Sequence, residues 1–262
     1  ILKQNGSDKI EGSTDDFAVN QEGAAVTLVF VDSTKGWIIT DTGNSSDAFV
    51  APFIAATGGT ETTSGNCKIH TFTGPGTFSV CRAAVAAANN QVSYIVVAGG
   101  ASGGSSHGGG GGAGGFREDK SPVTPYTASP LDGAGNITIA SGSYPITVGA
   151  GGAAKPVSTG QGNAGSTSVF STITSAGGGG GGGEYSPGNQ PGGNGGSGGG
   201  AGADTNPGSG NTPPTTPSQG NNGGDDGHGS PGYGGGGGGG HSAVGANAIG
   251  GFAQSDANEH LY

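Results

Sequence analysis

The sequence predicts a mostly β and irregular fold, in which a small β-rich part is followed by a long part dominated by glycine. Short β-prone runs separated by turn residues occupy the region before residue 99. Of the 262 residues, 64 are glycine and only 30% are hydrophobic. A side-chain core for the whole length is therefore out of reach, because ordering each residue costs roughly 1–2 kcal/mol of backbone entropy. Either much of the chain is disordered, or backbone hydrogen bonds order it.

The charge balance excludes several kinds of partner. The chain carries 8 Lys and Arg against 18 Asp and Glu, a net charge of −10, and Lys155 is its last basic residue. Binding to nucleic acid or to an anionic membrane surface calls for basic clusters, so we expect no nucleic-acid partner. No apolar run approaches the length of a membrane span, so we expect no membrane insertion. Because the first residue is Ile1, we expect the chain to be a piece of a longer product.

Residues 1–50 are predicted to form a β-rich module for attachment or oligomerisation. The runs "FAVN", "AAVTLVFVD" and "KGWIITD" are β-prone and are separated by turn residues. In the second run both faces of the strand are partly apolar, with Val26, Leu28 and Phe30 on one face and Val29 and Val31 on the other. A hairpin of this size is marginal in water by itself, so we expect the module to associate with other copies of the chain.

Residues 51–98 are predicted to form a β-hairpin and a strand that connect the two parts. The stretch "CKIHTFTGPGTFSVC" has β-prone arms around Gly74-Pro75-Gly76. If the pairing is centred on Gly74, Cys67 faces Cys81 and a disulfide is possible. Two free thiols are the equal alternative, because a shift of one residue changes every pair. The following "RAAVAAANN" fits either one helical turn or a loop. "YIVVAGG" is predicted to be the last strand that packs through its side chains.

Residues 99–262 contain three glycine runs, at 108–112, 177–183 and 234–240. Composition alone favours flexible linkers. Two features indicate order instead: the runs follow β-prone stretches such as "SVFSTITSA", and segments without Cβ atoms can pack backbone against backbone. Extended threefold helices rise about 3.1 Å per residue, and rods of this kind lying side by side can bond their N–H and C=O groups to one another. "GGGGGAGGFRE" is then predicted to be the first rod.

The ordered series "HTFTGPGTFSV", "YIVVAGG", "GGGGGAGGFRE", "YPITVGAGG" and "GSTSVFSTITSAGGGGGGG" resembles the glycine-rich domain of bacteriophage tail fibres and their distal adhesins. The N-terminal module is similar to a small β-module of phage fibre and spike proteins, which is often trimeric. The resemblance implies a sandwich of polyglycine II helices over residues 99–262, with long surface loops at the distal end. It further implies a place on the virion at the distal tail fibre, a homotrimer, another tail fibre protein as partner, and a bacterial surface receptor that is an outer-membrane protein or a polysaccharide.

Motifs for catalysis are missing from the sequence. Gly149, Gly151 and Ala154 match a dinucleotide-binding fingerprint, but no helix-forming stretch follows and no acidic residue comes about 20 positions later. The five histidines and two cysteines show no metal-ligand spacing. We therefore predict a protein that is not an enzyme and that binds no cofactor or metal.

The best candidates for binding are polar and aromatic residues between the glycine runs, since binding residues concentrate on loops held by a rigid scaffold. Tyrosine suits this role because it offers a flat apolar face and a hydroxyl at low entropic cost. Tyr185 and Tyr233 could instead pack on the rods, and Asp225 and Asp226 could be ordinary turn residues; Tyr144 is expected to pack. The candidates are Tyr126, Tyr185, Asn189, Gln190, Asp204, Asp225, Asp226, His228 and Tyr233.

We expect a receptor-binding tip of a phage tail fibre. The alternative is a structural virion spike or extracellular filament subunit with a polyglycine scaffold and no specific receptor.

Overall fold

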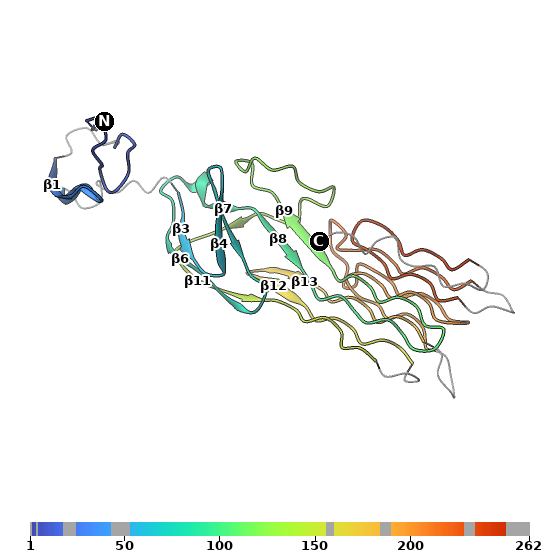
Figure 1. Ribbon diagram of the computed structural model, residues 1–262. Coiled ribbons are helices and arrows are strands. Elements are labelled where there is room, and N and C mark those ends of the chain that lie inside the picture. The colour runs from blue at the N-terminus through green and yellow to red at the C-terminus, as the bar shows by residue number, and fades with distance from the viewer. Residues whose placement is uncertain are drawn as a thin grey trace. The chain divides into compact units, whose positions relative to one another are not determined.

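The computed structural model describes residues 2–3, 5–17, 25–42, 53–155, 160–183, 190–227 and 234–249. It contains two compact units, one made of Ile1–Ile54 with Arg82–Asn89 and the other of Ala55–Cys81 with Asn90–Tyr262. Short antiparallel strands and extended glycine segments make up the described part, which has no α-helix and one 3₁₀ turn at Ala87–Asn90 (Figure 1). The prediction of a mostly β and irregular fold is confirmed.

The first unit is built on one antiparallel hairpin, β1 (Val26–Asp32) and β2 (Gly36–Thr42). Its turn is closed by the Asp32 carboxylate, which accepts hydrogen bonds from the Thr34 and Lys35 amides at 2.7 Å each. These bonds, that of Lys35 foremost, lower the pKa of Asp32. Both strands were predicted from the sequence and are confirmed, whereas most of "FAVN" lies outside the described residues.

The second unit begins with four small sheets. A five-stranded sheet has the order β13-β12-β11-β6-β3, and three two-stranded sheets pair β4 with β5, β7 with β10 and β8 with β9. The strands are β3 (Ala55–Thr57), β4 (Thr60–Ser64), β5 (Cys67–Thr71), β6 (Gly76–Arg82), β7 (Gln91–Val92), β8 (Tyr94–Val97), β9 (Phe116–Asp119), β10 (Ile137–Thr138), β11 (Gly142–Thr147), β12 (Ser168–Phe170) and β13 (Ile173–Ser175).

Aromatic rings form the side-chain core of this unit. Phe78 packs edge-on against His70 and Phe170, with ring centroids 5.0 and 6.2 Å away, and Tyr94 packs against Phe170 at 5.9 Å. Tyr144 lies against Phe78, and its hydroxyl accepts a hydrogen bond from the Ala140 amide at 2.9 Å. Tyr144 is therefore packed, but against the aromatic cluster of the sheets rather than against the glycine rods as expected.

The predicted hairpin around Gly74 is wrong. Strand β5 pairs with β4, so that Cys67 lies opposite Ser64, while β6 pairs with β11. Cys67 and Cys81 are free thiols, Cys67 half-buried and Cys81 exposed. The sequence "TTSGNCK" explains the difference, because Gly65 takes a φ of 56° as the first central residue of a two-residue turn and closes the β4–β5 hairpin locally.

Beyond the sheets, the glycine-rich part forms extended rods that lie side by side (Figure 1). The rods are bonded to one another by backbone hydrogen bonds, and no described residue of the three glycine runs has a positive φ. They are numbered here along the chain: rod 1 (98–105), rod 2 (108–115), rod 3 (149–155), rod 4 (160–167), rod 5 (176–183), rod 6 (190–196), rod 7 (197–204), rod 8 (205–211), rod 9 (219–226), rod 10 (234–240) and rod 11 (243–249).

The hydrogen bonds of rod 1 repeat every three residues. The amides of every third residue from Ala98 donate to rod 2, and those of every third residue from Gly99 donate to rod 4, all at 2.9–3.0 Å. The bonds run from Ala98 to Gly115, Ala101 to Gly112 and Gly104 to Gly109, and from Gly99 to Ser166, Ser102 to Asn163 and Ser105 to Gly160. Because every third residue faces the same neighbour, the segment is a threefold helix of the polyglycine type.

Rod 7 is surrounded on all sides. Backbone bonds join it to rods 2, 5, 6, 8, 9 and 10, which is a complete hexagonal shell. Ser197 and Ala201 in this rod are fully buried. The Ser197 hydroxyl donates to the Gly114 carbonyl at 2.9 Å, so even this buried side chain serves the bonding between rods. The core of the glycine-rich part is therefore made of main chain.

Strands and rods share one register. In the β8–β9 ladder Tyr94 faces Asp119 and Val97 faces Phe116, and the bonds between rods 1 and 2 continue the same pairing to the turn at Ser106-His107. Both turn residues have positive φ, 45° and 50°, as a type I′ hairpin requires. The strand prediction for "YIVV" is confirmed, but the first rod begins at Ala98, and "GGGGGAGGFRE" contributes the second rod and strand β9.

We predict that Gly199→Ala destabilises the protein by about 1–3 kcal/mol or more, because a Cβ atom there would overlap the Gly180 carbonyl of rod 5. Chemical denaturation followed by circular dichroism measures the loss. The matched control is Gly74→Ala, since a Cβ at Gly74 meets nothing within 4 Å. Equal stability of the two variants would contradict a core of closely packed main chain.

Candidate binding site

Connections between rods lie at both ends of the bundle, and one end gathers those that follow the outgoing rods. Rod 1 runs away from β8 and rod 2 returns to β9, so the turn at Ser106-His107 marks the end remote from the sheets. Rod 5 runs parallel to rod 1, and rod 7 runs parallel to rod 5. Rods 4, 6 and 8 run in the opposite direction, back toward the sheets. The described residues that border segments 156–159, 184–189 and 228–233 lie at this same end, which we call the loop end.

The described residues at the loop end are tied to one another by hydrogen bonds. The His107 carbonyl accepts from the Ala203 amide at 3.2 Å, and the Asp226 carboxylate accepts from the Asp204 amide at 2.6 Å. The Asp225 amide donates to the Asn247 side chain at 2.8 Å. Segments far apart in the sequence therefore present one fixed surface, as a pre-organised binding site needs.

The structure brings four of the predicted binding residues to this end. Asp204 is exposed with a φ of 55°, Gln190 is exposed, Asp225 is half-buried, and Asp226 is buried at 7% exposure. The Asp226 carboxylate thus acts as a local cap as well as a candidate contact. Four more predicted residues lie outside the described residues: Tyr185, Asn189, His228 and Tyr233.

Sequence reasoning missed His107 as a candidate. It is exposed at the loop end, in the tight turn between rods 1 and 2. The available signal was the polar "SSH" between two glycine-rich segments, a pattern typical of a turn between rods.

Tyr126 does not belong to this end. It follows β9, on the sheet side of the rods, where the Lys120 ammonium lies 5.9 Å from its ring centroid. Burial of its hydroxyl, with a contribution from the nearby Glu118 carboxylate, raises the pKa of Tyr126 to about 12. Glu118 is 1% exposed and accepts hydrogen bonds from the Ser129 amide and hydroxyl. Tyr126 is thus a half-buried residue of the sheet side, near Glu118 and Lys120.

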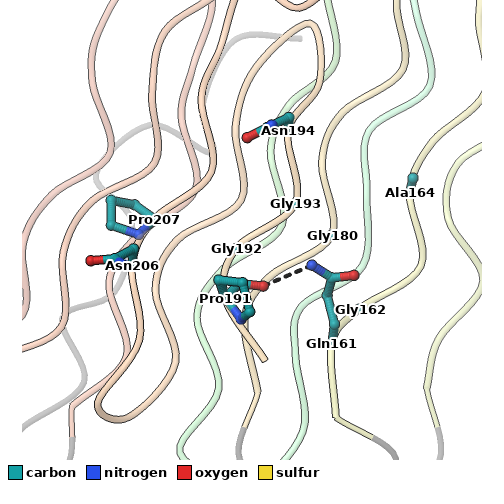
Figure 2. Close-up of a pocket in the computed structure, with 10 residues that line it drawn as sticks. All are labelled: Gln161, Gly162, Ala164, Gly180, Pro191, Gly192, Gly193, Asn194, Asn206 and Pro207. Carbon is teal, nitrogen blue, oxygen red and sulfur yellow. Dashed lines mark hydrogen bonds between the residues drawn. The ribbon is translucent and has the colours of Figure 1, made fainter. Parts of the chain in front are cut away.

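A groove opens on the flank of the rods, beside the loop end. It has a volume of about 620 Å³ and spans rods 4, 5, 6 and 8 (Figure 2). Gly180 of rod 5 lines it between Gly162 and Gly193, and the Gln161 amide donates across it to the Pro191 carbonyl at 2.7 Å. No charged residue lines it; the ten lining residues are Gln161, Gly162, Ala164, Gly180, Pro191, Gly192, Gly193, Asn194, Asn206 and Pro207.

Among the described residues, no cluster of His, Cys, Asp and Glu could hold a metal ion. No helix in the described part is long and apolar enough to cross a membrane. The groove offers hydrogen bonding from amides and main chain, and the loop end adds the carboxylate of Asp204 and the imidazole of His107, all on a rigid support.

Extended threefold rods joined by main-chain bonds define the class: a glycine-rich domain with a backbone core. The family model described as "Glycine-rich domain" matches residues 72–260, and the chain belongs to that family. Searches of curated proteins and of solved structures gave no match.

We predict that two tyrosines titrate late in an ultraviolet absorbance titration. Burial raises the pKa values of both Tyr94 and Tyr126 to about 12, from an ordinary value of about 10. Between these values the unfolded chain releases protons that the folded chain keeps, so the free energy of unfolding falls as the pH rises from about 10 to 12. Tyr126→Phe should remove one late step, and titration of all tyrosines near 10 would contradict the burial of these two hydroxyls.

Proposed function

We propose that the chain is the adhesin at the tip of a bacteriophage tail fibre, which recognises a receptor on the bacterial surface. The supporting observation is that connections from distant parts of the sequence meet at one end of a bundle stabilised by main-chain bonds. Binding residues need positional precision, and rods of this kind supply it whatever the loop sequences are. The resemblance of the motif series to tail fibre domains supports the same assignment.

The proposed virion location and partners follow from this assignment. The tip is extracellular, at the distal tail fibre, and its other partner is another tail fibre protein. The segments that join rods 5 to 6 and 9 to 10 hold four of the nine predicted receptor residues, namely Tyr185, Asn189, His228 and Tyr233. A structural spike or filament subunit would have the same rods, but its function would not require particular residues in these segments.

The test measures binding of the fluorescently labelled chain to a panel of bacterial strains. Replacing residues 184–189 and 228–233 by Gly-Ser segments of equal length should lower binding to a recognised strain at least about tenfold, because the contacts most central to binding are lost. Thermal unfolding should stay unchanged, since the rods are intact.

Val123→Ser is the matched control, because Val123 is 67% exposed and lies on the sheet side, in the segment after β9. It should bind cells as the original chain does. Binding that survives the loop replacement overturns the assignment to these loops. A chain that binds none of the strains supports the structural alternative instead.

The N-terminal unit is proposed to assemble the chain into a homotrimer. Val29, Phe30 and Val31 of β1 and Trp37 of β2 are 39–50% exposed on a two-stranded hairpin that is marginal alone. Phe30 and Trp37 pack edge-on against each other with ring centroids 5.5 Å apart, and the exposed Val29 and Val31 add apolar surface, which marks the hairpin as an interaction surface. Analytical ultracentrifugation should give three times the chain mass, and Val29→Ser combined with Val31→Ser should shift it to monomer. A monomeric original chain would refute the trimer.

A further inference from the structure

The flank groove coincides with a gap in the packing around rod 5. Backbone bonds join rod 5 to rods 1, 2, 4, 6 and 7, and successive members of the series 4, 1, 2, 7 and 6 are bonded to one another. Within the described residues, no backbone bond joins rod 4 to rod 6. A hexagonal shell has six positions, so the space between rods 4 and 6 is the one left unfilled, and Gly180 lies at its floor.

Several hydrogen-bonding groups at this groove have no partner among the described residues. They include the backbone amides of Gly180 and Ala164, the side-chain amide of Asn206 and the Nδ2 group of Asn194. Asn194 is held in place because its Oδ1 atom accepts from the Ser209 amide at 2.7 Å. Donors and acceptors thus line one concave surface whose backbone cannot move without breaking the bundle.

The lining chemistry selects an uncharged ligand rich in hydroxyl groups. No charged residue lines the groove, so an anion or cation would find no counter-charge there. Primary amides both donate and accept, as hydroxyl groups do. The rings of Pro191 and Pro207 add C–H surface of the kind that packs against the apolar face of a sugar ring. The volume of about 620 Å³ lies in the range of small-ligand sites.

We propose that the groove binds a segment of neutral surface polysaccharide, an inference that rests on the proposed function and specifies its ligand class. Gln161, Pro191 and Asn206 stand at the loop-end starts of rods 4, 6 and 8, so a glycan in the groove lies next to the loop end. The groove then supplies sugar contacts on the rigid bundle, and the loops supply further contacts that differ with the host.

An extended glycine-rich peptide is the competing occupant, since it has the shape of a missing rod. Two hydrogen bonds argue against a peptide in this position. The backbone N–H of Gln161 donates to Gln190 Oε1 at 3.0 Å, and the Gln161 side chain donates to the Pro191 carbonyl at 2.7 Å. This side chain already crosses the space that a rod would fill (Figure 2). Recognition of extended proline-rich peptides also uses aromatic grooves, and no described aromatic residue lines this one.

The experiment uses the full chain and the purified surface polysaccharide of a strain that it binds, separated into neutral and acidic fractions. Isothermal titration should show binding of the neutral fraction, weakened about three- to tenfold by Asn206→Ala, the loss expected for one or two hydrogen bonds. The control is Asn136→Ala, an exposed asparagine in the segment between β9 and β10.

Three results would overturn the inference while leaving receptor binding standing: binding of the acidic fraction alone, equal binding by the Asn206→Ala variant, or displacement of the polysaccharide by a heptaglycine peptide. Binding of cells with no binding of either polysaccharide fraction would also overturn it and point to a protein receptor. Failure of the chain to bind any strain refutes the proposed function itself.

Discussion

The structure depends on hydrogen bonds between backbones that approach more closely than Cβ atoms permit. An isolated threefold helix leaves every N–H and C=O group to water. Packed side by side, the rods satisfy these groups mutually, and rod 7 does so with six neighbours at once. Glycine loses more backbone entropy on folding than any other residue, so the order must come from many such bonds formed together. This explains why a chain with few apolar side chains can hold a fixed shape.

The transition from side-chain core to main-chain core occurs without a change of register. Phe170 faces Ile173 in the β12–β13 hairpin, and the same pairing continues outward where Gly165 and Gly162 of rod 4 donate to Gly178 and Gly181 of rod 5. The β8–β9 hairpin continues into rods 1 and 2 in the same way. The aromatic cluster around Phe78 therefore fixes the alignment of rods that have no side chains to define their own. A flat run of glycine specifies register weakly, and these hairpins remove that ambiguity.

The sequence predicts the parts of this fold that have a local signal. "YIVV" and "SVFSTITS" are β-prone and become strands, and the run 177–183 becomes a rod. The partner of β5 was mispredicted because Gly65 closes a nearer turn than Gly74 does. The rod at the centre could not be predicted, since residues 197–204 include Ser197, Ala201 and Ala203 and look less regular than the glycine runs. Which rod is enclosed depends on contacts between distant segments, and composition does not encode those contacts.

The candidate site shows the same division. Turn chemistry and polar content were enough to select the segments between runs, and Gln190, Asp204, Asp225 and Asp226 all lie at the loop end, where Asp204 and Asp226 are bonded to each other. The position of Tyr126 and the flank groove could not be predicted, because both depend on the direction in which each rod runs, and a connection can lie at either end of a rod. The direction of each rod is known only once the outgoing and returning rods of the whole bundle have been traced. A scaffold of this kind constrains its glycines by close contact, so sequence changes at the surface turns cost less stability than changes within the rods.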